Sequence, residues 1–272
     1  MNALVKTPSR IATLPLLIAA CTGCWKPPDA VDPRPGAGLI WIIPGIEGSE
    51  WSVAQAYRAL RDGGVQSDIR VYNWWNPNPL ANLTEYNQNR KRAGEIAQQI
   101  TEYRRRNPLD DISLIGYSGG GGLAVFTAEA LPESARLRHV VLIQAAISPD
   151  YDLTPTLTRI DGKLVNLYSP LDYLVLGVGT SVFGTMDRKN VPAAGNVGFV
   201  AERAAPDPAL RSKLEQRPWT LDAVLTGHFG THLGKAEYEW NRRFVVPYFA
   251  PNGADIGPPA YEVHAAETSQ SF

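Results

Sequence analysis

The stretch from residue 111 to residue 130 constrains the fold of this chain more than any other. Residues 112–115 form a short apolar run that predicts a buried strand, and the small and apolar residues after Gly119 predict a helix. The turn between them reads G-Y-S-G-G, which has the form G-x-S-x-G with Ser118 at its centre. A serine held in so sharp a turn is strained, and the positions two before and two after it have room for almost no side chain. The N–H groups at the start of the helix then point at the serine hydroxyl. The pattern therefore predicts that Ser118 is a nucleophile.

Two other structures can produce such a glycine-rich turn, a phosphate-binding loop and a plain structural turn. Neither G-x-x-x-x-G-K-[ST] nor G-x-G-x-x-G occurs here. The sequence thus favours the nucleophile over a phosphate-binding loop and leaves the plain turn as the alternative.

Elsewhere in the chain, apolar strand patterns alternate with helical patterns. Predicted strands lie at residues 39–43, 69–74, 112–115, 140–143, 164–168 and, as a short final candidate, 197–200. Predicted helices lie at residues 52–60, 84–106 and 235–249, and residues 203–226 are expected to be irregular. Such alternation indicates an α/β fold, a mostly parallel doubly wound sheet with helices on both faces.

Composition excludes several classes of function. The chain has 272 residues, of which 44% are hydrophobic and 19% charged, which is typical of a folded globular protein. A net charge of −1 gives no electrostatic basis for binding nucleic acid. The two cysteines, Cys21 and Cys24, lie near the N-terminus, so the main domain has no thiol for catalysis or for a thiolate metal site. We expect no cofactor and no metal.

The N-terminal residues have the pattern of an export signal. Lys6 and Arg10 precede an apolar segment, residues 11–20, that is too short to span a bilayer. Residues 17–21 read L-I-A-A-C, which resembles a bacterial lipobox with Cys21 as the lipidated residue. A signal peptide cleaved after Ala20, an uncleaved anchor, and lipidation at Cys24 are the alternatives.

These signals divide the chain into four parts. Residues 1–20 are the predicted signal peptide, 21–38 a proline-rich tether, 39–250 the folded domain and 251–272 a loose tail. We expect an exported lipoprotein, held at a membrane of the bacterial cell envelope by its lipid anchor.

The domain resembles the α/β-hydrolases. The resemblance rests on the G-x-S-x-G turn, on Asp172 just past the next-but-one strand, and on histidines before the last helix, in the order that this family uses. It covers roughly residues 39–249. The chain departs from the family pattern because it lacks the early antiparallel strands and has a long path from the last strand to the histidine.

The resemblance implies a catalytic triad of Ser118, Asp172 and His232. His228 is the alternative base, because both histidines lie in one glycine-rich loop, G-H-F-G-T-H-L-G. The two could instead be metal ligands, but there is no H-E-x-x-H motif and Gly230 argues against a helix. Asp150 and Asp152 are the alternative acids.

The resemblance also implies an oxyanion hole made by backbone N–H groups of Gly119 and Ile46. Gly45 or Glu47 could supply the second N–H, and we expect the Glu47 side chain to point to solvent. The aromatic residues Tyr72, Trp74 and Trp75 are interpreted either as the lining of a substrate pocket or as plain core.

The expected activity is hydrolysis of small-molecule carboxylic esters through an acyl-enzyme. Two alternatives remain open at this stage. One is transfer of the acyl group to an alcohol on the same triad, and the other is a catalytically inactive, membrane-tethered binding domain.

Overall fold

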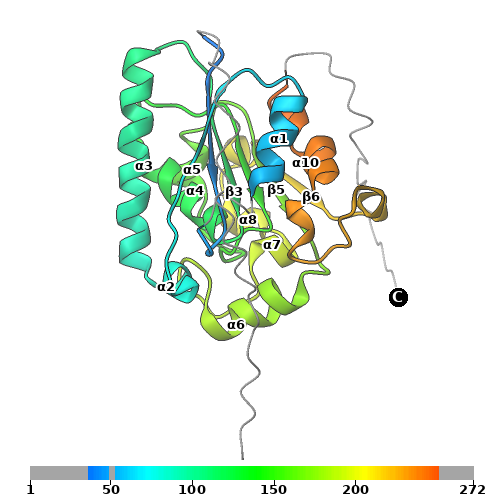
Figure 1. The fold of residues 1–272 in the computed structure, drawn as a ribbon. Helices are drawn as coiled ribbons and strands as arrows, with labels where there is room; N and C mark the ends of the chain where they lie inside the picture. The colour runs from blue at the N-terminus through cyan, green and yellow to red at the C-terminus, as the bar shows by residue number, and fades with distance from the viewer. Residues whose placement is uncertain (1–35, 49–52, 251–272) are drawn as a thin grey trace, which may run out of the picture.

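The computed structural model describes residues 36–48 and 53–250 (Figure 1). The predicted signal peptide, Cys21, Cys24 and the tail therefore lie outside the described residues, as does most of the tether. Within the two described ranges, no helix is both long and apolar enough to cross a membrane.

A sheet of six parallel strands forms the centre of the molecule, in the order β2-β1-β3-β4-β5-β6. The strands are β1 Leu39–Ile43, β2 Asp68–Val71, β3 Ile112–Tyr117, β4 Val140–Ile143, β5 Leu164–Tyr168 and β6 Leu214–Pro218. Because all neighbours are parallel, the carboxyl ends of the strands meet at one edge of the sheet, where open α/β sheets place their functional groups.

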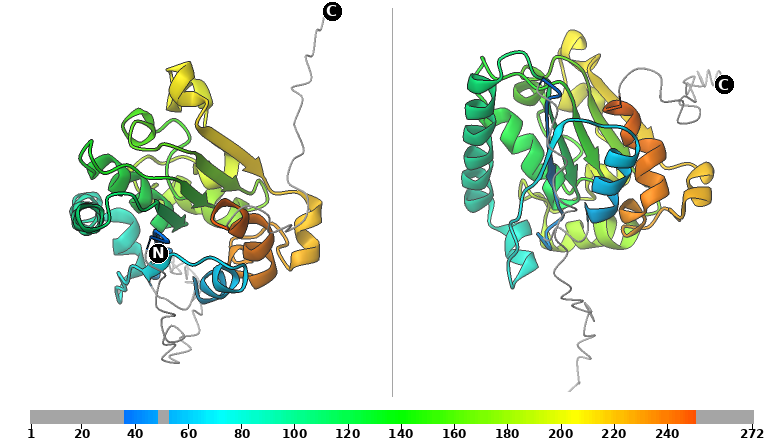
Figure 2. Two further views of the ribbon diagram at one scale, coloured as in Figure 1. Left: turned by 90° about the horizontal axis from the view of Figure 1, so that it is seen from above. Right: turned by 45° about the horizontal axis from the view of Figure 1, so that its top comes forward.

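Helices cover both faces of the sheet (Figure 2). The α-helices are α1 Ala54–Asp62, α2 Pro79–Thr84, α3 Tyr86–Arg106, α4 Gly119–Ala130, α5 Thr154–Leu157, α6 Thr180–Phe183, α7 Ala194–Val197, α8 Ala201–Ala204, α9 Pro208–Arg211 and α10 Tyr238–Phe244. A π-helical segment, η2 Tyr173–Gly179, precedes α6, and 3-10 turns lie at η3 Leu221–Thr226, η4 Gly234–Ala236 and η5 Val246–Tyr248. Helices α3 and α4 pack on one face, and α1 and α10 pack together on the other. The predicted doubly wound parallel sheet is confirmed.

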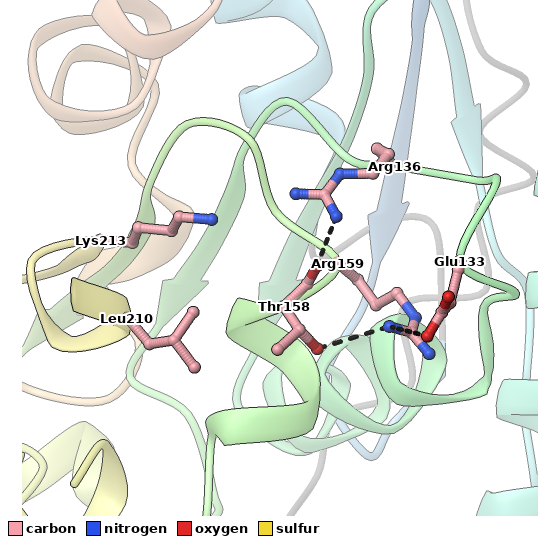
Figure 3. A pocket seen from close by; sticks show the side chains of 6 residues that line it. All are labelled: Glu133, Arg136, Thr158, Arg159, Leu210 and Lys213. Carbon is pink, nitrogen blue, oxygen red and sulfur yellow. Dashed lines mark hydrogen bonds and ion pairs between the residues drawn. The ribbon is translucent and has the colours of Figure 1, made fainter. Parts of the chain in front are cut away.

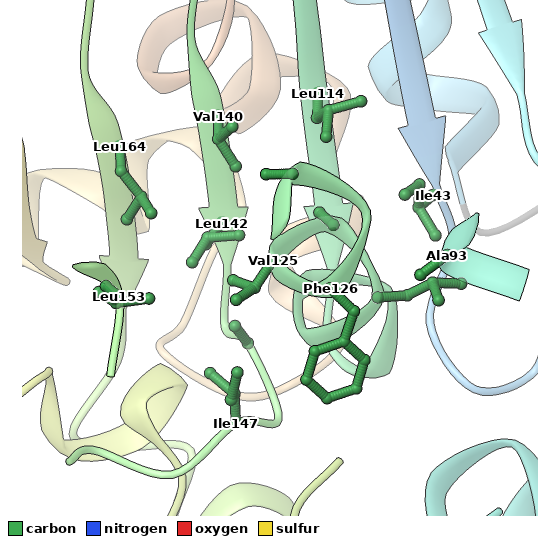
Figure 4. Close-up of a cluster of buried hydrophobic side chains, with 14 of the residues drawn as sticks. Ile43, Ala93, Leu114, Val125, Phe126, Val140, Leu142, Ile147, Leu153 and Leu164 are labelled. Atoms are coloured by element: carbon green, nitrogen blue, oxygen red, sulfur yellow. The ribbon is translucent and has the colours of Figure 1, made fainter. Parts of the chain in front are cut away.

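Two apolar cores lie between the sheet and these helices. On one face, Leu114, Val140 and Leu142 contact α4 through Val125 and its neighbours (Figure 4). The core on the other face joins alternate residues of the same strands to α1 and α10. Central strands buried on both faces read as continuous apolar runs, which is why they were visible in the sequence.

The predicted last strand at 197–200 is wrong. Helix α7 ends at Val197, and Gly198 has a φ of +81°, which turns the chain away from an extended path. The last strand is β6, inside the segment that was expected to be irregular, which also contains α9 and the end of α8. β6 reads L-E-Q-R-P and is half-buried at the edge of the sheet, so it has no apolar run to reveal it.

The predicted helix at 235–249 is likewise interrupted. The structure divides it into η4, α10 and η5, with Pro247 in the last turn. Proline removes a backbone donor and ends a regular helix, which explains why α10 stops at Phe244.

Candidate active site

Ser118 lies in the tight turn between β3 and α4, with φ +53° and ψ −121°. A non-glycine residue in this region of backbone space is strained and needs its surroundings to hold it. The Ser118 N–H donates to the Ile143 carbonyl at the end of β4 (2.9 Å) and its own carbonyl accepts from Gly121 (2.9 Å). A Cβ on Gly116 would lie 2.5 Å from the Gly120 carbonyl oxygen, and a Cβ on Gly120 would collide with the Pro44 carbonyl. The G-x-S-x-G spacing is therefore required by close packing.

The side chains of Ser118, His232 and Asp172 meet at the carboxyl edge of the sheet. Ser118 Oγ lies 2.9 Å from His232 Nε2, and His232 Nδ1 lies 2.5 Å from Asp172 Oδ2. Ser118 follows β3, Asp172 follows β5, and His232 belongs to the loop before η4. A hydrogen bond from Ser169 Oγ to the Gly230 carbonyl (2.6 Å) ties the end of β5 to this loop.

The electrostatics of this site favour a neutral imidazole. Burial, followed by the positive charge of Lys235, lowers the pKa of His232, while the hydrogen bond and charge of Asp172 raise it. A carboxylate at Nδ1 keeps the proton on that nitrogen, so Nε2 presents a lone pair to the Ser118 hydroxyl. The arrangement can remove a proton from Ser118.

His228, the alternative base, is bonded elsewhere. Its Nδ1 accepts the Gly230 N–H (2.9 Å), its carbonyl accepts the indole N–H of Trp219 (2.9 Å), and its ring packs on Trp240 at 5.0 Å. Burial lowers the pKa of His228 to about 4, so its imidazole is neutral. In the described ranges no three side chains gather as a metal site, around these histidines or elsewhere. His228 holds the loop that carries His232.

The two alternative acids do not reach His232. Asp150 forms an ion pair with Lys189 (2.9 Å), which lowers the pKa of Asp150, and Asp152 accepts the N–H of Thr154 (2.9 Å). Of the three candidates, the structure places only Asp172 beside the imidazole.

The loop after β1 brings Ile46 next to Gly119, the first residue of α4. The Ile46 nitrogen would lie 3.5 Å from a Cβ on Gly119, so two backbone N–H groups belong to one small region beside Ser118. Asn82 fixes this loop from behind, because its Nδ2 donates to the carbonyls of Ile46 (2.8 Å) and Trp74 (3.0 Å). These positions are suited to binding an oxyanion.

The aromatic residues expected near the site differ in their placement. Trp74 is buried and donates its indole N–H to the Pro44 carbonyl (3.2 Å), so it supports the same loop. Tyr72 packs edge-on against Trp41, whereas the Trp75 side chain is exposed.

Glu47 does not point away into solvent as expected. It is half-buried, its carboxylate folds back over Gly45 with Cδ 3.1 Å from where a Cβ on Gly45 would lie, and its charge raises the pKa of both His232 and Lys235. The positive charge of the buried Lys235 explains this orientation of Glu47, because it stabilises a carboxylate that faces the site.

Two residues of the site were missed by the sequence analysis. Gln144, with φ +45° just after β4, donates its Nε2 to Asp172 Oδ2 (3.0 Å) and to the Thr231 carbonyl (3.3 Å). Lys235 is buried, with its Nζ 2.5 Å from His232 Nε2. The spacing of His232 and Lys235 before a helix was the one available sequence signal for the lysine.

Exposed apolar side chains occur on the segment around and after Asp172 and on the loop that carries His232. Leu171 lies against Gly230, which brings these two segments together. The exposed apolar residues are Leu171, Tyr173, Leu174, Val175, Val178, Val182, Phe183, Phe229 and Leu233. We call this set, whose members flank Asp172 and His232 in the sequence, the apolar rim.

A surface pocket of ≈ 490 Å³ lies at the opposite end of the strands from Ser118, near the amino ends of β5 and β6 (Figure 3). Its basic side chains are already bonded to the protein. Arg136 donates to the Thr158 carbonyl (2.7 Å), Arg159 to the Leu131 carbonyl (2.9 Å) and Lys213 to the Ile160 carbonyl (2.6 Å). These cations satisfy loop carbonyls, so the pocket has a structural explanation.

Comparisons with known proteins identify similar folds. No family model matches the chain, and no curated protein matches it significantly. Lipase B of Aspergillus fumigatus is similar at 11% identity, with a TM-score of 0.51 over 82% of this chain and 55% of that one. The chain thus spans about half the length of that lipase.

Two further similar structures have lower TM-scores. The poly(3-hydroxybutyrate) depolymerase LpqC of Bordetella parapertussis is 11% identical, with a TM-score of 0.49 over 83% of this chain and 86% of that one. A cutinase-like protein from Cryptococcus sp. is 16% identical, with a TM-score of 0.41 over 80% of this chain and 97% of that one. The parallel sheet, the strand–Ser118–helix turn and the similarity to lipase B give the chain an α/β-hydrolase fold.

Proposed function

We propose that the chain is a serine hydrolase of carboxylic esters. The observation that carries the proposal is the 2.9 Å contact between Ser118 Oγ and His232 Nε2, made by a serine with φ +53° at the start of a helix. A strained backbone at the serine and a base within hydrogen-bond distance of its hydroxyl are both features of an activated nucleophile.

In the first half of the reaction, His232 Nε2 takes the Ser118 proton as Oγ attacks the ester carbonyl carbon. The N–H groups of Gly119 and Ile46 stabilise the oxyanion. His232 then gives the proton to the leaving alcohol, and the acyl group stays on Ser118.

In the second half, His232 removes a proton from water, which attacks the acyl-serine and releases the carboxylic acid. Asp172 holds the Nδ1–H throughout and stabilises the imidazolium. Gln144 keeps the Asp172 carboxylate in place.

The apolar rim favours esters with apolar groups. Its residues flank Asp172 and His232 in the sequence, and an exposed apolar set is typical of a surface that contacts apolar ligands.

The test is hydrolysis of p-nitrophenyl esters of increasing acyl length, from acetate to decanoate. We expect kcat/KM to rise with length and Ser118→Ala to remove the activity. Ser212→Ala, which changes an exposed serine before β6, is the matched control. Retention of wild-type rates in folded Ser118→Ala would exclude this mechanism.

We also propose that the domain is exported and held at a membrane surface by a lipid on Cys21. The support is the L-I-A-A-C sequence at residues 17–21. Such an anchor would bring the domain to esters of membrane origin.

A further inference from the structure

Within residues 36–48 and 53–250, the proposed mechanism leaves the buried cation Lys235 without a role. This residue lies in η4, three positions after His232, and is 9% exposed. Hydrogen bonds connect its backbone to the residue before Ser118. The Lys235 carbonyl accepts a hydrogen bond from Asn241 Nδ2 (2.9 Å), and Asn241 Oδ1 accepts one from the hydroxyl of Tyr117 (2.5 Å). A charge taken into the interior at this position needs an explanation, since burial disfavours it.

Lys235 and Ser118 reach the same atom. Lys235 Nζ lies 2.5 Å and Ser118 Oγ lies 2.9 Å from His232 Nε2. Because Nδ1 bears the proton that is donated to Asp172, Nε2 has one in-plane lone pair. An ammonium is a donor only, so a charged Lys235 occupies the lone pair that must accept the Ser118 proton.

The positive charge of Lys235, like its position, opposes the transfer of the Ser118 proton to His232. General-base catalysis turns His232 into an imidazolium, and an ammonium in contact with it opposes that change. Four titratable groups bear on Lys235: His232 and His228 from its own loop, Asp172 after β5, and Glu47 after β1. The two carboxylates oppose the effect of burial, which is the largest influence and lowers the pKa of Lys235 to about 8. Both the ammonium and the amine are therefore accessible near neutral pH.

We infer that Lys235 regulates the Ser118–His232 pair by pH, because its ammonium occupies His232 Nε2 and blocks ester cleavage, whereas its neutral amine permits it. The inference rests on the proposed serine-hydrolase function. Before the attack, the ammonium releases one proton to water and becomes an amine. The Ser118 proton then passes to Nε2 and on to the leaving alcohol, so Lys235 gains and loses nothing during the turnover itself.

The test is the pH dependence of kcat/KM between pH 5 and pH 10 with a p-nitrophenyl ester. Because the protonated form is inactive, wild-type activity is lost as the pH falls through the pKa of Lys235. Lys235→Met removes the competing donor and the charge but keeps an unbranched side chain. Its activity should then follow His232 alone, so the acid limb moves down by about 1.5 units or more, because the wild-type limb lies near the Lys235 pKa of about 8 and an unperturbed histidine titrates near 6.5. At pH 6 the variant should be at least about tenfold more active than the wild type.

Lys235→Arg supplies the opposite change, because a guanidinium stays charged at every pH used. It should be at least about a hundredfold less active than the wild type at pH 9, where the wild-type lysine is an amine. Lys235→Leu, which also has neither a charge nor a donor, is measured alongside and replaces the Met variant if that protein does not fold. An acid limb that moves to lower pH in either neutral variant supports the inference.

An acid limb at the wild-type position in the folded neutral variants, with activity merely reduced, would overturn the inference. Lys235 would then only support the loop. The proposed function fails separately, if Ser118→Ala keeps its activity at all pH values.

Discussion

Ser118 and Gln144 share a strained backbone, with φ of +53° and +45°. They follow neighbouring parallel strands, β3 and β4, and both take part in the chain of contacts that ends at Asp172. Such strain persists only where surrounding bonds hold it, and it clusters where side chains must be aimed. At this site it aims the hydroxyl of Ser118 at His232 and the amide of Gln144 at Asp172.

Gln144→Met tests the second of these roles. The Oε1 atom of Gln144 has no partner among the described residues, so methionine removes only the donor to Asp172 and Thr231. We expect kcat to fall about tenfold through a less well-held carboxylate, with a stability change of about 1 kcal/mol. Steady-state kinetics and thermal unfolding measure both. An unchanged kcat in the folded variant would remove Gln144 from the positioning of Asp172.

The two histidines provide a second test at the same scale. His232→Ala should lower kcat by several orders of magnitude, because it removes the base, whereas His228→Ala should cost about tenfold through loop disorder. His228→Ala should also lower the melting temperature, since the ring packs on Trp240 and accepts from Gly230. The reverse order of kcat losses would assign the base to His228.

Among the elements, the central strands and the edge strand β2 could be predicted from the sequence, whereas the edge strand β6 could not. β1, β3, β4 and β5 are buried, and buried strands require apolar residues, so each of them is recognisable in the sequence as an apolar run. β6 is defined by its pairing with β5, a long-range contact that leaves no local pattern in L-E-Q-R-P.

The residues of the site likewise differ in whether the sequence could predict them. Ser118 could be located because its turn demands glycines at short range. Gln144 belongs to the site through a contact with Asp172 that forms only when β4 and β5 pair, and no local motif encodes it. Lys235 lies three positions from His232, a spacing that does not by itself show that its side chain is buried against the imidazole.

The loop from Pro44 to Gly48 is the element that carries Ile46, and Asn82 of α2 fixes it. Asn82→Ala should therefore loosen this loop and lower kcat by about 10- to 100-fold, less than the loss of about 10²–10³ that follows when an oxyanion donor is removed outright. KM should change less, because the apolar rim is untouched. The control is Asn190→Ala, which changes an exposed asparagine that donates hydrogen bonds to the carbonyls of Ser181 and Val182. Equal kcat values for the two variants would contradict a role for the loop in catalysis.

For the whole molecule, the prediction concerns the anchor. Cys21→Ser should give a protein that takes up no labelled palmitate and leaves the membrane fraction of the cell, since a lipid is the proposed attachment. Cys24→Ser is the matched control and should stay in the membrane fraction. Labelling that depends on Cys24 instead would move the attachment site, and labelling unaffected by either change would contradict the lipoprotein prediction.

The central claim is that Ser118 is a nucleophile activated by His232. It is tested most directly by incubating the folded protein with a fluorophosphonate and measuring the mass of the intact chain and of its peptides. We predict the addition of one phosphonyl group per chain, on the peptide that contains Ser118, and a rate that falls by orders of magnitude in His232→Ala but little in His228→Ala. A protein that hydrolyses esters without acquiring this group, or that acquires it at another residue, would contradict the claim.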